Sequence, residues 1–155
     1  MKAWQGRRFA VLVEDGHETA DTPDAVAIVA LDAEGRIVLV RQHRRSVRAD
    51  VLELPAGLVD EGEELLATAK RELREETGLR GGSWRELTSF WTSPGFVNER
   101  VTVFVADGLD EGEPEPDEGE ELEVVRWTRE EVEARIESFE DATTLIGLLL
   151  YLREA

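Results

Sequence analysis

The stretch from Gly57 to Leu79 reads GLVDEGEELLATAKRELREETGL, and it indicates more about the fold than any other part of the chain. Its apolar residues recur at the three- and four-residue spacing of an amphipathic helix, which predicts a helix over residues 63–77. Gly78 follows directly, and glycine is typical of the position just past a helix C-terminus. The stretch therefore predicts a loop, then a helix with a defined end.

Two acids of this helix lie in or beside its apolar stripe, whereas a helix that is only solvated would carry its acids on the opposite face. On a helical wheel at about 100° per residue, Glu76 falls inside the apolar stripe and Glu72 at its edge. Burial of an ionised carboxylate is costly without a partner, and a metal ion is one such partner. Because the two residues are one turn apart, both can reach the same cation. An Arg/Glu-rich helix with ordinary surface ion pairs is the alternative that the wheel alone leaves open. The stripe consists of Leu65, Leu66, Ala69 and Leu73.

The rest of the chain reads as short strands and two further helices. The helices are expected at about 129–137, where Thr128 and Glu131 fit a capping box, and at about 142–153. Residues 107–123 contain ten acids and no base, so we expect a loop for most of this length, solvated and mobile in its first half. The interleaved elements indicate one domain of the α/β (α+β) class. Strands are expected over 8–13, continuing at 17–20, and over 25–31, 36–42, 51–54, 84–91, 99–106 and 122–127.

Composition narrows the function classes. The 155 residues suffice for one domain with its own core, and the absence of cysteine excludes thiol nucleophiles, cysteine zinc sites and disulfides. The chain has 35 acids against 18 bases, a formal charge of −17, which argues against nucleic-acid binding and against an anionic membrane surface. No apolar run is long enough to span a bilayer. We expect a cytoplasmic protein whose carboxylates solvate the surface or bind divalent cations.

The stretch 57–79 also resembles the Nudix box, and every fixed position of the box is present. The resemblance implies the Nudix fold, a mixed β-sheet sandwiched between helices. It also implies hydrolysis of a nucleoside diphosphate linked to another moiety, by attack of water on phosphorus. The implied cofactor is Mg²⁺ or Mn²⁺, as two or three ions when substrate is bound. The matching positions are Gly57, Glu63, Arg71-Glu72-Leu73, Glu75-Glu76 and Gly78-Leu79.

The resemblance assigns roles to individual residues of the box. It implies that Glu72 and Glu76 are the core metal ligands, that Glu75 is a further ligand or a water-held neighbour, and that the backbone carbonyl of Ala56 is another ligand. Gly57 is expected to let the loop pass close to the metals. The structural positions are Glu63, Gly78 and Arg71, which is expected to pair with Glu75 and orient it.

Four further features resemble the ADP-ribose pyrophosphatase subgroup. They are the runs LELPAG (52–57) and VRQHR (40–44), a proline sixteen residues after Gly78, and a glutamate at position 99. The subgroup implies a small-molecule nucleoside diphosphate substrate, with AMP and ribose 5-phosphate as products. A Nudix enzyme for another pyrophosphate and a non-catalytic nucleotide-sensing module are the alternatives. Candidate substrate-binding residues are Arg44, Trp91, Pro94, Gly95 and Glu99.

The acidic stretch and the N-terminus carry the last two expectations. Enzymes of the subgroup use a glutamate of a late loop as general base, and the resemblance places this base at Glu118, with Glu120 as a loop metal ligand. Glu120 is the alternative base, and Glu75 is the remaining candidate if neither acts. Residues 1–20 are strand-like and too short to be a domain, so we expect a dimerisation arm and a homodimer. Trp4 and Phe9 of this arm are candidates for stacking on adenine.

Overall fold

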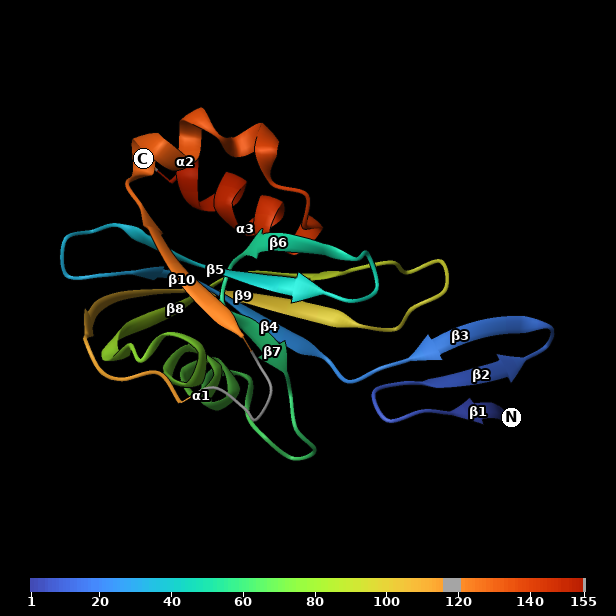
Figure 1. Ribbon diagram of the computed structural model, residues 1–155. Helices are drawn as coiled ribbons and strands as arrows, with labels where there is room; N and C mark the ends of the chain where they lie inside the picture. The colour runs from blue at the N-terminus through green and yellow to red at the C-terminus, as the bar shows by residue number, and fades with distance from the viewer. Residues whose placement is uncertain (116–120, 155) are drawn as a thin grey trace.

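A computed structural model describes residues 1–115 and 121–154, and a mixed seven-stranded sheet forms its centre (Figure 1). Five strands follow the order β10-β5-β4-β9-β8, while β6 pairs with β5 and β7 pairs with β4. The pair β4 and β9 is parallel, and the other pairs are antiparallel. The strands are β4 (Ala25–Leu31), β5 (Ile37–Arg44), β6 (Ala49–Glu53), β7 (Ala56–Leu58), β8 (Arg80–Trp91), β9 (Arg100–Asp110) and β10 (Leu122–Trp127).

Helices cover both faces of this sheet, which confirms the expected sandwich (Figure 1). One face carries α1 (Leu65–Thr77), and the other carries α2 (Arg129–Ala134), η1 (Ile136–Ser138) and α3 (Ala142–Leu152). Strand β4 shows the cause, because alternate residues of a strand point to opposite faces. Its Val26 and Ile28 pack in the cluster that contains Leu73 of α1, whereas Val29 packs in the cluster that contains Leu148 of α3. No helix in the described ranges is long and apolar enough to cross a membrane.

The N-terminal residues form a separate small sheet beside the main body (Figure 1). This arm is antiparallel and consists of β1 (Lys2–Gln5), β2 (Ala10–Glu14) and β3 (His17–Asp21). Its last strand is joined to the β8–β9 loop, because the Ala20 N–H donates to the Phe96 carbonyl at 2.7 Å. The Asn98 side chain also donates to Asp21 at 2.6 Å. These bonds place the arm against the end of the main sheet.

Several element boundaries differ from those expected. Strand β1 was not predicted, and Pro55 interrupts the expected strand 51–54 without ending the sheet, because β7 follows and pairs with β4. Helix α1 begins at Leu65, not at residue 63, and Leu66 is exposed instead of part of the apolar stripe. The helix expected at 129–137 ends at Ala134 and is followed by η1.

The expectation of a solvated loop in the first half of 107–123 was wrong for residues 107–110, whereas residues 111–115 have no regular structure and are mostly exposed. Strand β9 continues to Asp110 because β8 begins at Arg80 and pairs with it over this length. Beyond the strand, the Glu115 N–H donates to the carbonyl of Glu75 at 2.9 Å, which provides a partner for a carbonyl near the end of α1. Gly78, at φ 79°, also lies so close to this segment that a Cβ would meet the Gly112 carbonyl oxygen at 2.1 Å. The segment is therefore packed against the end of α1.

Candidate active site

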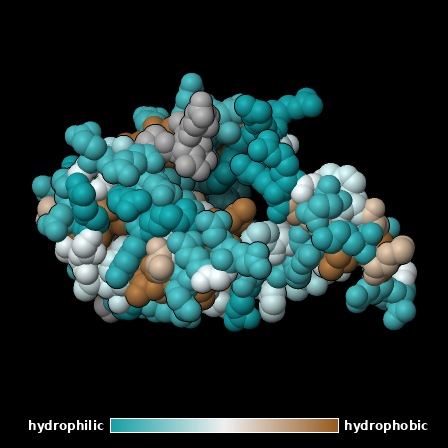
Figure 2. Space-filling model, turned by 90° about the horizontal axis from the view of Figure 1, so that it is seen from below, coloured by the Kyte–Doolittle hydropathy of each residue, from teal (hydrophilic) through white to brown (hydrophobic). Residues whose placement is uncertain are grey.

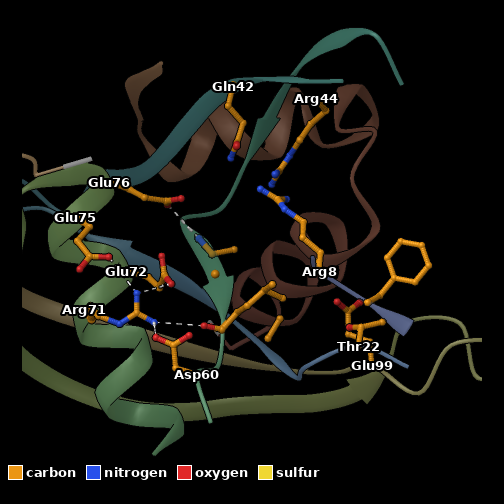
Figure 3. A pocket seen from close by; sticks show the side chains of 15 residues that line it. Arg8, Thr22, Gln42, Arg44, Asp60, Arg71, Glu72, Glu75, Glu76 and Glu99 are labelled. Atoms are coloured by element: carbon orange, nitrogen blue, oxygen red, sulfur yellow. Dashed lines mark hydrogen bonds and ion pairs between the residues drawn. The ribbon is translucent and has the colours of Figure 1, made fainter. Parts of the chain in front are cut away.

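A cavity of about 580 Å³ lies where α1, β5, β7 and the arm meet. Figure 2 shows a hollow between the main body and the arm, with mostly hydrophilic residues around it. Figure 3 shows the acidic side chains of α1 on one side of the cavity, with Arg44 and Arg8 on the other. The polar and charged residues that line it are Arg8, Thr22, Gln42, Arg44, Asp60, Arg71, Glu72, Glu75, Glu76 and Glu99.

Glu76 is buried, as the helical wheel predicted, with only 7% of its surface exposed. Its carboxylate accepts a hydrogen bond from the backbone N–H of Ala56 at 3.2 Å. This bond joins α1 to the first residue of β7, which pairs with Ala27 of β4. Helix and sheet together therefore fix the carboxylate of Glu76 at the cavity.

Glu72 lies against the backbone of Gly57. A Cβ at position 57 would be 2.0 Å from Cδ and 2.1 Å from Oε1 of Glu72, so no side chain fits there while the carboxylate keeps its place. Gly57 itself pairs with Val26 within the sheet, which prevents the backbone from moving away. Gly57 therefore permits the close approach of the Glu72 carboxylate, and its expected approach to the metals stays a prediction.

Arg71 binds three carboxylates at once. Its guanidinium donates to both oxygens of Glu63 at 3.1 and 3.0 Å, to Glu72 at 2.8 Å and to Glu75 at 3.1 Å. The predicted contact between Arg71 and Glu75 is therefore confirmed. Hydrogen bonds from Arg71 lower the pKa of Glu63 to about 2, and the bond to Glu63 is the main reason that the pKa of Arg71 is raised. Arg71 thus fixes the orientation of Glu72 and Glu75 at the cavity wall.

The donor set fits a hard divalent cation. Such ions take oxygen ligands from carboxylates and backbone carbonyls, and Glu72, Glu75 and Glu76 offer carboxylates along one wall (Figure 3). Ala56, whose carbonyl is the expected further ligand, also lines the cavity. The absent Cβ of Gly57 leaves the space that the Glu72 carboxylate occupies. Within the described ranges, no three carboxylate or imidazole side chains are already grouped as a metal cage, and Arg71 holds one oxygen each of Glu72 and Glu75.

Arg44 lines the opposite side and is held by a buried acid. Its Nε donates to Glu53 at 2.9 Å, and its Nη2 also contacts that carboxylate, which is 8% exposed. The hydrogen bond to Glu53 raises the pKa of Arg44. Arg44 therefore forms an ion pair with a buried acid. Arg44 is thus in place at the cavity, and its role in substrate binding stays a prediction.

The other expected substrate-binding residues differ in whether they line the cavity. Glu99 lines the cavity, whereas Trp91, Pro94 and Gly95 do not, in the part of the chain that the structure describes. Trp91 is half exposed, and the Arg100 guanidinium lies 5.2 Å from its ring centre. A substrate role for these three residues stays a prediction. Glu118 and Glu120 lie outside the described residues.

From the sequence we did not identify four polar or charged residues that line the cavity. Arg8 and Thr22 line it, as do Gln42 of β5 and Asp60 of the loop before α1. Phe9, an expected candidate for adenine stacking, lines the cavity too, and Trp4 does not, although its ring lies 5.3 Å from that of Phe9. No local motif could have indicated Arg8, because its position depends on the turn between β1 and β2.

Comparisons with known proteins agree with this geometry. A family model described as the NUDIX domain matches residues 21–144. An ADP-ribose pyrophosphatase of Bacillus subtilis (strain 168) is 42% identical over 143 residues, which cover 89% of this chain and 77% of that protein. A protein of Bacillus methanolicus named methanol dehydrogenase activator is 38% identical over 140 residues, covering 86% and 75%. A crystal structure of an ADP compounds hydrolase superposes with a TM-score of 0.84 at 27% identity, covering 99% of this chain and 89% of that one.

Proposed function

This chain belongs to the Nudix family, and from that premise we propose that it hydrolyses ADP-ribose, or a related nucleoside diphosphate sugar, to AMP and ribose 5-phosphate. The observation that carries the proposal is the group of α1 carboxylates at a cavity, in a chain 42% identical to an ADP-ribose pyrophosphatase. Family membership also implies a divalent metal cofactor. The single domain 1–155, the ADP-ribose substrate and the use of Mg²⁺ or Mn²⁺ are parts of the proposal.

Each residue of the cavity wall then has a chemical task. Glu72 and Glu76 hold the cations, with Glu75 and the Ala56 carbonyl as further ligands, for two or three ions in the substrate complex. The bound cations offset the diphosphate charge and lower the pKa of coordinated water. Arg71 and Glu63 keep the carboxylates oriented.

The reaction itself needs a base and a leaving group. A water oxygen attacks one phosphorus of the diphosphate, the bond from that phosphorus to the bridging oxygen breaks, and the base takes a proton from the water. We propose Glu118 as this base and Glu120 as a loop ligand, with Glu120 and then Glu75 as alternatives. Arg44 stabilises the charge of the phosphates from the opposite side of the cavity.

A substrate panel tests the proposed function. ADP-ribose, a nucleoside triphosphate, a dinucleoside polyphosphate, NAD and FAD are each incubated with the full chain and Mg²⁺, and the products are identified by chromatography. We expect the highest kcat/KM for ADP-ribose, with AMP and ribose 5-phosphate formed in equal amounts. Glu76→Gln, purified in parallel, controls for contaminating hydrolases. A higher kcat/KM for one of the other compounds would show that ADP-ribose is not the preferred substrate. The absence of turnover with every compound would contradict the proposal that the protein is an enzyme.

The base is assigned by two single variants. Glu118→Gln is expected to lower kcat strongly with little change in KM, because a base acts mainly in the transition state. Glu120→Gln is expected to weaken the apparent affinity for Mg²⁺ as well. If Glu120→Gln alone abolishes kcat at saturating Mg²⁺, the base is Glu120, and if both variants stay active, Glu75 becomes the base.

We also propose that the protein is a homodimer in which residues 1–20 form part of the interface. The supporting observation is the small sheet β1–β3, which leaves Trp4 and Phe96 exposed. Exposed aromatic side chains are typical of interfaces. Light scattering at micromolar concentration is expected to give twice the monomer mass of 17.4 kDa. A monomer mass would contradict the proposal.

A further inference from the structure

Two arginines at the cavity lie outside the Nudix box, Arg44 and Arg8, and they differ in their partners. Three arginines line the cavity, and two of them are bound by carboxylates: Arg71 by Glu63, Glu72 and Glu75, and Arg44 by Glu53. The third, Arg8, has no hydrogen bond or ion pair with any residue in 1–115 or 121–154. In a protein with 35 acids, an arginine at an acidic cavity that has no carboxylate partner among the described residues needs an explanation.

The fold of the arm determines where Arg8 lies. Arg7 and Arg8 occupy the tip of the turn between β1 and β2, which is closed by a hydrogen bond from the Gly6 N–H to the Phe9 carbonyl at 2.9 Å. The Trp4 ring covers Gly6 so closely that a Cβ there would be 2.2 Å from it, and it also contacts Phe9. The Trp4 ring therefore packs against the turn and stabilises its conformation. Of its two tip residues, only Arg8 lines the cavity.

The side chain of Arg8 points toward that of Arg44 on the side of the cavity that faces the α1 carboxylates (Figure 3). Two guanidinium groups repel one another unless an anion lies between them. Glu53 offsets the charge of Arg44 from behind, which leaves the guanidinium of Arg8 for a group that enters from solvent. Phosphate suits this position, because a planar guanidinium can bind two phosphate oxygens at once.

We infer that Arg8 is a substrate-binding residue that contacts the diphosphate, and that it acts on the cavity of its own chain. The inference rests on the proposed function, since it assumes a diphosphate substrate. Cations bound by the α1 carboxylates would then hold the diphosphate from one side, while Arg8 and Arg44 hold it from the arm and β5. The arm is thereby part of the active site as well as a proposed dimer interface.

Arg8→Ala and the matched control Arg7→Ala test this assignment by steady-state kinetics with ADP-ribose. Loss of a charge-assisted hydrogen bond to phosphate is expected to raise KM about ten- to hundredfold for Arg8→Ala, with kcat nearly unchanged. Arg8→Lys is expected to fall in between, because lysine keeps the charge and loses the bidentate geometry. Arg7→Ala carries the same change of net charge and is expected to keep the wild-type KM. A wild-type KM for Arg8→Ala would overturn the inference while leaving the proposed function intact, whereas a wild type without turnover would refute the proposed function first.

Two competitive inhibitors identify which part of the substrate Arg8 contacts. Inorganic pyrophosphate is expected to inhibit Arg8→Ala more weakly than wild type by the same factor as the change in KM, and adenosine is expected to inhibit both equally. The reverse pattern would show that Arg8 contacts the adenine ring, which would contradict the inference.

Mixed subunits test whether Arg8 acts within its own chain. Arg8→Ala and Glu76→Gln chains are unfolded together and refolded as one pool. If Arg8 serves its own cavity, no chain in the mixture has an intact site, so the KM stays high. Recovery of a population with wild-type KM would show that Arg8 reaches the partner's cavity instead.

Discussion

Gly57→Ala is the most informative single substitution, because its consequence follows from one close contact. The added Cβ would lie 2.0 Å from Cδ of Glu72, 2.1 Å from Oε1 and 2.4 Å from Oε2. Carbon atoms in contact are separated by about 3.5–4.0 Å, so the carboxylate must retreat by roughly 1.5 Å. The backbone gives no relief, because Gly57 is paired with Val26 in the sheet.

The effect is expected on metal binding and turnover more than on folding. Gly57 is absent from the glycines with positive φ, so alanine can adopt its conformation without strain. A displacement of about 1 Å at a catalytic group costs on the order of 100-fold in rate, and a disturbed metal ligand costs about 10- to 100-fold in metal affinity. We therefore expect kcat to fall about 100-fold with a small change in Tm.

Mn²⁺ titration followed by electron paramagnetic resonance gives the affinity, and ADP-ribose hydrolysis over a Mg²⁺ series gives kcat at saturation. Gly35→Ala is the matched control, because Gly35 has φ 75° and nothing within 4 Å of the added Cβ. That variant is expected to lose about 1–2 kcal/mol of stability from the left-handed backbone and to keep its metal affinity. If Gly57→Ala binds Mn²⁺ and turns over like wild type, Glu72 is not a metal ligand in this geometry.

Three further predictions concern Glu76, Glu63 and Arg126. Glu76→Gln should remain folded, as judged by circular dichroism, and lose on the order of 10³ or more in kcat, because a carboxylate that holds the cations is removed. The pKa of Glu63 is lowered from 4.5 to about 2, so its stabilising contribution is complete above pH 4.5 and is lost as the pH falls toward 2. Urea titrations should therefore show a flatter pH dependence of stability for Glu63→Gln in this window. Arg126→Gln removes the partner of Glu111, and hydrogen exchange of the Glu115 amide, which bonds to the end of α1, should become faster while Tm changes little.

Local periodicity explains what the sequence could predict about the site. The helical repeat alone placed Glu76 in an apolar stripe, and the structure buries it. The contact between Arg71 and Glu75, which the Nudix resemblance implied, is also present, at 3.1 Å. Both predictions concern neighbours on one helix, where distance in the sequence determines distance in space.

Pairing between distant segments explains what the sequence could not predict. Strand β7 has three residues, too few for a periodic signal, and it forms only because β4 offers a free edge beside it. The acids after residue 106 predicted a loop, yet β9 extends to Asp110 because β8 pairs with it, and the backbone beyond the strand bonds to the end of α1. Arg8 reaches the cavity through a turn whose first strand has no buried residue. In each case a distant partner decides the conformation.

The distribution of charge in the cavity makes the binding of the diphosphate dependent on the binding of the metal cations. Five carboxylates and three arginines line it, and four of the carboxylates, Asp60, Glu72, Glu75 and Glu76, lie on or beside α1. An anionic diphosphate is repelled from that wall unless cations are bound there, whereas the opposite wall, with Arg8 and Arg44, attracts it without them. A diphosphate can therefore lie across the cavity only when the acidic wall is loaded with metal. We therefore expect metal binding to be a condition for productive substrate binding, as well as for the chemical step.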